Sequence, residues 1–162
     1  MRTLLAALAL WLCMSGALAG PFEDGFTAVQ RGDYAAALKL WKPLADQGDA
    51  LAQLNLGLMY STGEGVPQDY VEAVKWTRKA ADQGLAQAQF NLGVMYSKGQ
   101  GVPQDYVEAH KWYNLSAARA TEKETRDMAT GNRDIVAAKM TPAQVAEAQK
   151  LAREWKPEPS KK

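Results

Sequence analysis

Cysteine is almost absent from the 162-residue sequence, because the single copy, Cys13, lies within the first 19 residues. Those residues have the order of an export signal: Arg2 precedes an uncharged apolar run, and Ala17-Leu18-Ala19 supplies small residues for cleavage. The run is shorter than the ~20 residues that span a membrane as a helix. Cleavage after Ala19 leaves a mature chain without any disulfide, thiol nucleophile or thiolate metal site.

The signal predicts a periplasmic or secreted protein of the kind that Gram-negative bacteria export, with Gly20 as its first residue. Two alternatives are an uncleaved membrane anchor and a lipoprotein acylated on Cys13. The lipoprotein is disfavoured because Leu10-Trp11-Leu12 offers no small residue directly before the cysteine. We therefore expect a soluble product.

An excess of either charge is also missing. The sequence has 19 Lys and Arg against 18 Asp and Glu, and loss of Arg2 with the signal leaves 18 of each sign in 143 residues. Proteins that bind nucleic acids carry a basic excess or a basic stripe, so no nucleic-acid partner is expected. No second apolar segment of membrane length occurs, so no stable membrane insertion after cleavage is expected either. A chain of this length suits one domain.

Catalytic motifs are lacking as well. His110 is the only histidine, and a single imidazole without a paired cysteine, serine or second histidine makes neither a catalytic group nor a zinc site. Neither Ser-x-x-Lys nor Gly-x-Ser-x-Gly occurs. The sequence predicts a protein that is not an enzyme and uses no cofactor or metal, with His110 as a packing or surface residue.

An internal repeat is the strongest signal that is present. Residues 49–84 match residues 85–120 at 22 of 36 positions, and a fixed period of this length is typical of stacked helical repeats. The shared core runs from Ala52 to Trp76 and again from Ala88 to Trp112. Residues 20–48 align with the same unit as a degenerate first copy with a shorter interhelix loop.

Within each full repeat the apolar spacing is helical. Ala52, Leu56 and Tyr60 share one face of a first helix, and Gly57 beside them costs about 1 kcal/mol of helix propensity, which suggests close approach of the second helix. That second helix is predicted over residues 70–81, capped by Asp69 and ended by Gly84. Tryptophans recur once per unit and are predicted to pack between neighbouring repeats; they are Trp41, Trp76, Trp112 and Trp155.

The period is lost after Ala120, but the helical signal continues. Met128, Gly131, Ile135 and Ala138 form one stripe, which predicts a helix over about residues 122–139, weakened by Gly131-Asn132 in its middle. Thr141-Pro142-Ala143-Gln144 predicts the start of a last helix with a capping box. Residues 121–155 are thus expected to cap the array, and residues 156–162 to form a disordered tail.

The repeated pattern Ala-x-x-Asn-Leu-Gly-x-Met-Tyr, Gly-x-Gly-Val, Asp-Tyr and Ala-x-x-Trp resembles the Sel-one-like repeat (SLR), a relative of the tetratricopeptide repeat (TPR) with a longer interhelix loop. The resemblance covers about residues 22–120. It implies an all-α fold, an α/α superhelical solenoid of TPR/SLR-type helix pairs with a C-terminal helical cap and a concave groove. It also implies a non-catalytic protein–protein adaptor or regulator of the cell envelope.

In such repeats the first helix of each pair lines the groove. Asn55 and Met59, repeated as Asn91 and Met95, are not needed by the packing face and are the candidate partner-binding residues. Their amides suit an extended peptide backbone, and methionine adapts to varied side chains. The alternative is that the asparagines only brace neighbouring helices.

The expected partner is a protein of unspecified identity, bound by a monomer. Two other functions stay open at this point. One is a cell-wall or β-lactam-type hydrolase, which cysteine-rich exported relatives of the repeat resemble, although this chain lacks their cysteine pairs. The other is a structural subunit of an envelope complex.

Overall fold

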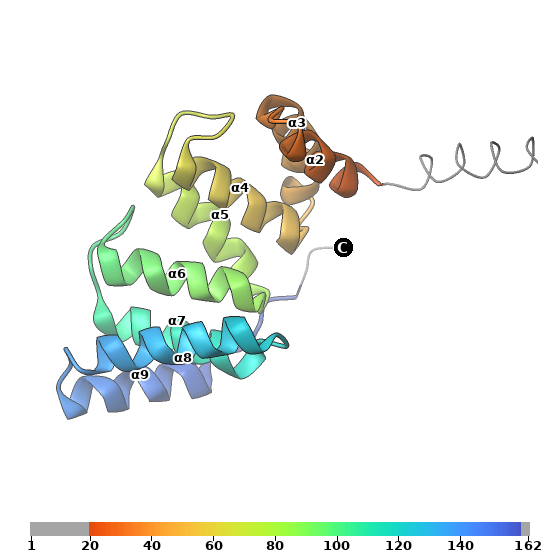
Figure 1. Cartoon of the computed structure of the whole chain (residues 1–162). Helices are drawn as coiled ribbons and strands as arrows, with labels where there is room; N and C mark the ends of the chain where they lie inside the picture. Colours follow the sequence, from red (N-terminus) through yellow and green to blue (C-terminus); the bar gives the residue numbers. More distant parts are fainter. Residues whose placement is uncertain (1–19, 160–162) are drawn as a thin grey trace, which may run out of the picture.

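A computed structural model describes residues 20–159 of the chain; the predicted signal peptide lies outside the described residues. Every regular element in this part of the chain is an α-helix. The labels follow Figure 1, and the bounds are α2 Pro21–Gln30, α3 Tyr34–Asp46, α4 Ala50–Thr62, α5 Tyr70–Asp82, α6 Ala86–Lys98, α7 Tyr106–Arg119, α8 Lys123–Ala137 and α9 Pro142–Glu154. The sequence pattern therefore predicted both the fold class and the helix pairs correctly.

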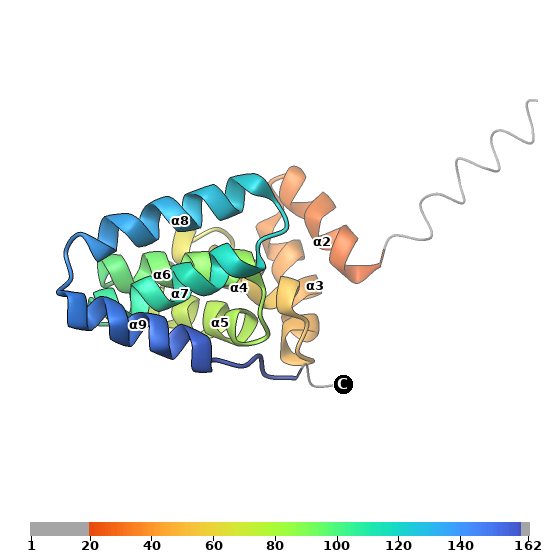
Figure 2. The same cartoon turned by 90° about the horizontal axis from the view of Figure 1, so that it is seen from below.

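The helices stack as successive pairs. Each first helix (α4, α6) packs on its own second helix (α5, α7) and on the second helix of the preceding pair. Figures 1 and 2 show the result as two layers, with α2 and α8 on one side and α5 and α9 on the other. At the C-terminal end α7 packs against α6, α8 and α9, so the last two helices cap the array.

Aspartates cap the start of α3, α4, α5 and α7, and glycines end α4 and α6. The Asp69 carboxylate accepts hydrogen bonds from the backbone N–H groups of Val71 and Glu72 at 2.9 and 3.1 Å, and Asp105 repeats this cap one unit later. Gly63 and Gly99 end α4 and α6 with φ of 78° and 68°, a left-handed conformation that favours glycine. The Asp-Tyr and Gly-x-Gly parts of the repeat thus fix the helix bounds.

The second glycine of each loop fixes the distance between repeats. A Cβ on Gly101 would overlap the backbone of Tyr70, the first residue of the preceding second helix, and a Cβ on Gly65 would lie 2.7 Å from the Cβ of Tyr34. Each long interhelix loop therefore rests on the neighbouring repeat. The longer loop of the full repeats is a contact between units as well as a turn.

The core lies between the repeats, as the recurring tryptophans predicted. Trp76 is 4% exposed and packs with residues of α3 and α4, including Trp41 and Leu56. Trp112 is 1% exposed and packs with α5 and α6, including Leu92. Each indole therefore belongs to two repeats at once.

The helix predicted over about residues 122–139 is present as α8, but its apolar stripe faces solvent. Met128 and Ile135 are 39% and 60% exposed, and Gly131 has open space around it. The side chains that α8 buries are Thr125, Ala129 and Val136. The physical reason is that α7 already presents bulky residues to α8, among them Tyr113 and His110, so smaller side chains of α8 fit against it.

The last helix and the segment after it close the end of the array. The capping box is present: Gln144 N donates to Thr141 Oγ1 at 3.3 Å, and Thr141 N donates to Gln144 Oε1 at 2.9 Å. Beyond α9 the chain turns back, and Glu158 N donates to Asp82 O at 2.7 Å, at the end of α5. The described part of the expected disordered tail, up to Pro159, is thus placed against the second repeat.

Candidate functional site

Exposed apolar side chains gather on the first helices. Of the six large hydrophobic residues that are exposed in residues 20–159, only Val71 lies on a second helix. The others occur on α2, α4 and α8 at exposures of 39–60%: Phe26, Leu51, Leu58, Met128 and Ile135. We call the outer sides of the first helices α2, α4, α6 and α8 the first-helix face. Exposed apolar residues that cluster on one face mark interaction sites.

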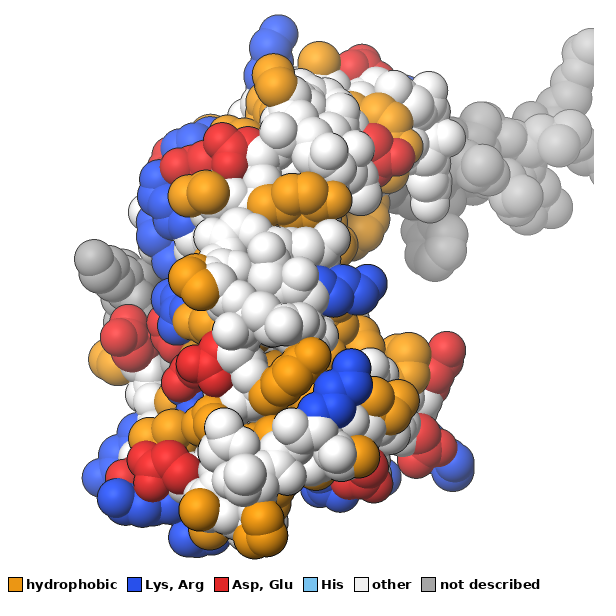
Figure 3. All heavy atoms as spheres, turned by 90° about the vertical axis from the view of Figure 1, so that its left-hand side faces the viewer, with side chains coloured by type: hydrophobic (Ala, Val, Ile, Leu, Met, Phe, Trp, Pro, Cys, Tyr) orange, Lys and Arg blue, Asp and Glu red, His pale blue; other side chains and the backbone are white. Residues whose placement is uncertain are grey.

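The first-helix face carries almost no charge at its centre. The segment of α4 contains no Asp, Glu, Lys or Arg, and α6 contains only Lys98, at its end. The second helices are richly charged by comparison. In Figure 3 the first-helix side lies at the right, where the outline is hollowed between its two ends; Lys and Arg side chains are denser along the left edge, although some also lie at the right. The low charge is therefore a property of α4 and α6, at the centre of the first-helix side.

A pocket opens on this face between α4 and α6. Its volume is about 240 Å³, and its walls include Leu58, Ser61, Phe90, Asn91 and Val94. The floor is formed by Gly57 and Thr77, where α5 approaches α4 closely. None of the lining residues is charged. The pocket can hold an uncharged side chain, and it offers hydroxyl and amide groups at its rim.

The two predicted asparagines lie at different places in this geometry. Asn91 lines the pocket, half-buried, and its Oδ1 accepts a hydrogen bond from Gln87 Nε2 at 3.2 Å. Asn55 is half-buried as well, but its Nδ2 is covered and makes no hydrogen bond within the described residues. The equivalent of Gln87 in its repeat is Leu51, which has no amide to offer. The pocket thus contains only one of the two asparagines.

The predicted methionines belong to the core. Met59 is 4% exposed among residues that include Trp41, and Met95 is 6% exposed among residues that include Trp112. Both methionines were expected to lie outside the packing face, but their long side chains fill space between repeats. Met95 reaches only the lining of the pocket. Met59 does not line the pocket. The partner-binding role of the methionines and the asparagines stays a prediction.

Sequence reasoning missed the apolar members of the site. Leu58 directly follows the close-approach glycine Gly57 and is 43% exposed. Val94 follows Gly93 in the same way, but it is partly buried against a cluster that includes Tyr113 of α7. The stripe on α8 is exposed because α8 contacts α7 through other side chains.

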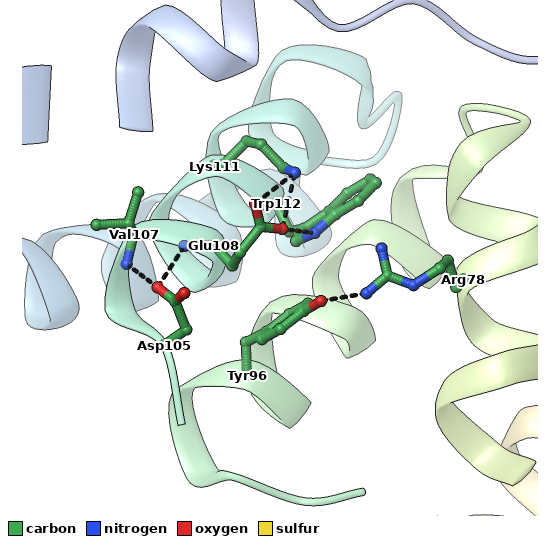
Figure 4. Close-up of polar contacts among 7 residues, drawn as sticks. All are labelled: Arg78, Tyr96, Asp105, Val107, Glu108, Lys111 and Trp112. Carbon is green, nitrogen blue, oxygen red and sulfur yellow. Dashed lines mark hydrogen bonds and ion pairs between the residues drawn. The ribbon is translucent and has the colours of Figure 1, made fainter. Parts of the chain in front are cut away.

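A polar seam between repeats holds the helices that frame the pocket (Figure 4). Arg78 donates a hydrogen bond to the Tyr96 hydroxyl, and its guanidinium lies 6.0 Å from the ring centroid of Trp112. Trp112 Nε1 donates to Glu108 Oε2 at 3.0 Å, and Lys111 Nζ pairs with the same carboxylate at 2.7 Å. This half-buried network ties α5 to α6 and α7, so it also fixes the distance of α6 from α4.

His110 packs between helices rather than facing the hollow. It is 3% exposed on α7, and its Nδ1 has no hydrogen-bond partner among the described residues. Burial, with a smaller contribution from the Arg133 cation, lowers the pKa of His110, while Asp134 opposes this. The prediction of a packing residue is confirmed.

The described residues show two further absences. Between residues 20 and 159 no helix is both long and apolar enough to cross a membrane. In the same part of the chain no three His, Cys, Asp or Glu residues are grouped closely enough to hold a metal ion.

Stacked helix pairs with a 36-residue period and a hollow face define an α/α repeat solenoid. The chain belongs to the Sel1 repeat family, whose model matches residues 17–49, 50–85 and 86–120. Proteins with this repeat generally serve as protein-interaction modules, and the fold is typically a non-catalytic scaffold. No curated protein sequence matches the chain.

Among the solved structures that resemble the chain, two share 32% sequence identity with it. One is a protective antigen of uropathogenic Escherichia coli with an SLR fold; it aligns with 83% of this chain at a TM-score of 0.76. The chain spans only 29% of the length of that antigen. The other is a Sel1 repeat protein from Oxalobacter formigenes, with a TM-score of 0.60. That alignment covers 68% of this chain and 86% of the Oxalobacter protein.

Proposed function

We propose that this protein is a non-catalytic adaptor or regulator of the bacterial cell envelope, which binds a segment of a protein partner on its first-helix face. The observation that carries the proposal is the distribution of surface chemistry. Among residues 20–159, five of the six exposed large apolar side chains lie on first helices, and α4 and α6 together contain a single charged residue, Lys98. Apolar side chains that stay in water contribute no burial to the stability of a monomer, so their exposure is better explained by a binding partner.

The chemistry of the face favours a peptide segment as the bound element. Leu58 and Val94 supply apolar contact, while Asn91 and Ser61 supply hydrogen-bonding groups beside them. Side-chain amides can pair with a peptide backbone without selecting its sequence, and the apolar groups contribute the burial. The pocket has no charged lining residue, so it imposes no charge requirement on the group that it binds.

Site-specific photo-crosslinking in intact host cells tests the proposal. A photoreactive residue placed at Leu58 should capture a partner protein, whereas the same residue at Val71 should not. Val71 is the matched control because it is also apolar and is 65% exposed, but lies on α5. Equal capture at both positions, or capture at Val71 alone, would remove the first-helix face from the proposal.

The envelope location rests on the amino-terminal sequence and has its own test. Protein from the native host should begin at Gly20 and appear in the osmotic-shock fluid or the culture fluid. Retention of Met1 on the native protein would contradict export. Turnover of nitrocefin by the purified protein would contradict the non-catalytic role and favour the hydrolase alternative.

A further inference from the structure

The three repeats differ in the residue of the second helix that faces the close-approach glycine of the first helix. Trp41, Thr77 and Tyr113 follow one another at intervals of 36 residues. Each faces the close-approach glycine of its own first helix: a Cβ on Gly25 would meet the Trp41 ring, and one on Gly93 would meet the Tyr113 ring at 2.7 Å. The equivalent atom at Gly57 is the Thr77 hydroxyl. The second repeat thus lacks the ring that its neighbours have.

In the first and third repeats the ring fills the space beside the first helix. Trp41 is 3% exposed, with its ring centroid 5.3 Å from that of Phe26. Tyr113 is 1% exposed, 5.7 Å from Phe90 between ring centroids. In the second repeat the corresponding space is the 240 Å³ pocket, whose lining includes both Gly57 and Thr77. A buried cavity of about 150 Å³ already admits benzene, so the pocket is large enough for a phenol or indole ring.

The rim of the pocket repeats the hydrogen-bonding group that Tyr113 uses. The Tyr113 hydroxyl lies 3.3 Å from the Ser97 hydroxyl, which itself donates to Val94 O at 2.9 Å. Ser61 stands 36 residues before Ser97, donates to Leu58 O at 2.8 Å in the same way, and lines the pocket. A phenol in the pocket therefore finds the partner that the third repeat provides within the chain.

We infer that the α4–α6 pocket binds one aromatic side chain of the protein partner, a tyrosine in preference to others, in the place that Trp41 and Tyr113 occupy in the adjacent repeats. This inference rests on the proposed function and names the chemistry of the partner segment. Because none of the lining residues is charged, a lysine or glutamate side chain would lose its hydration without a counter-charge. A phenylalanine would leave the Ser61 contact unmade.

The test uses a small probe that carries only the proposed group. N-acetyl-tyrosinamide is titrated into the isotope-labelled protein, and backbone and side-chain amide shifts are followed by NMR; N-acetyl-lysinamide is the comparison. We expect shifts at Asn91 and Ser61 with the tyrosine probe and none with the lysine probe. Thr77→Tyr should fill the pocket from within and weaken probe binding at least tenfold. Val71→Tyr adds the same residue to the same helix outside the pocket and should leave binding unchanged.

Thr77→Tyr restores the residue of the third repeat, so it should fold, with a melting temperature no lower than that of the parent protein. A variant that melts lower, a tyrosine probe that produces no shifts up to its solubility limit, or shifts that persist in Thr77→Tyr would each overturn the inference. Self-association that places the exposed Phe26 of a second copy in the pocket, and that Phe26→Ser abolishes, would also overturn it. If Leu58 still crosslinks the partner in the Thr77→Tyr protein, the inference fails while the proposed function stands.

Discussion

Two helical glycines in this protein should respond in opposite directions to the same substitution. Gly131 lies inside α8, and a Cβ added there meets nothing within 4 Å. Gly57 lies inside α4, where a Cβ would contact the Thr77 hydroxyl, the Thr77 backbone N at 3.2 Å and Ala73 O at 3.3 Å. Both are candidates for Gly→Ala, which removes the conformational freedom that glycine costs a helix.

The magnitudes follow from two opposing effects. Alanine in place of glycine in a helix interior contributes about 1 kcal/mol. Gly131→Ala should therefore raise the free energy of unfolding by nearly that amount and the melting temperature by about 3 °C. At Gly57 the same gain is opposed by overpacking of ~1–3 kcal/mol, and backbone atoms of α5 cannot rotate aside as a side chain can. Gly57→Ala should therefore lower the free energy of unfolding, by up to about 2 kcal/mol.

Urea denaturation followed by circular dichroism measures both variants against the parent protein. The expected result is a higher midpoint for Gly131→Ala and a lower midpoint for Gly57→Ala, with unchanged slopes. Stabilisation by both substitutions would refute the close approach of α4 and α5. Destabilisation by Gly131→Ala would refute the exposure of the outer side of α8.

Three further outcomes are expected. Trp112→Ala should cost about 3–5 kcal/mol, measured by denaturation, because it empties a 1% exposed site shared by two repeats; a loss below ~1 kcal/mol would contradict that packing. His110→Val, which installs the residue Val74 of the preceding repeat, should reduce the loss of stability on acidification. Burial lowers the pKa of His110, so the folded protein keeps it neutral while the unfolded chain takes up a proton as pH falls through the ordinary value of 6.5. The parent protein therefore loses stability in this pH range and the variant does not. The free energies of unfolding at pH 7.5 and pH 5.5 measure the loss in each protein, and equal losses would count against the role of His110. Asn55→Ala should change stability by less than ~1 kcal/mol, because the Nδ2 that it removes is buried without a partner, and unfolding of the variant would show instead that Asn55 braces the helices.

The period and the start and stop residues of the sequence were sufficient to predict the helix pairs. Asp69 caps α5 and Gly84 follows its end, as the pattern predicted, because caps and stops are local effects of backbone geometry. The close approach at Gly57 was predictable for the same reason: a helical glycine that costs stability implies a neighbour that needs the space.

The orientation of α8 could not be predicted from the sequence. A stripe of apolar residues at helical spacing indicates that one side of a helix avoids water, but not whether the covering molecule is the same chain. Met128 and Ile135 satisfy the pattern and are exposed, while Ala129 and Thr125 pack because α7 leaves room only for small side chains. For a helix at the end of an array, periodicity alone does not separate a core from an interface.

The pocket required the structure for a different reason. The alignment of the repeats already places the smaller Thr77 at the position equivalent to Tyr113. The alignment does not show whether the space left by the smaller side chain stays open, because the neighbouring helices could have closed it. The Arg78 to Tyr96 contact and the Trp112 packing keep α6 in place, so the space stays open to the hollow face.

The returning segment after α9 changes how the array comes apart. In a linear array each unit contacts only its neighbours, so the ends fray first and opening proceeds inward one unit at a time. Here Glu158 bonds to the end of α5, which skips the third repeat and joins the last segment to the second. Together with the packing of α9 on α7, this bond links the elements from α5 to α9 into a closed set of contacts, so we expect them to open together. The terminal pair α2 and α3 contacts the array on one side alone, through α4, Trp76 and the loop that contains Gly65. Amide hydrogen exchange should accordingly be fastest in α2 and α3 and nearly uniform from α5 to α9.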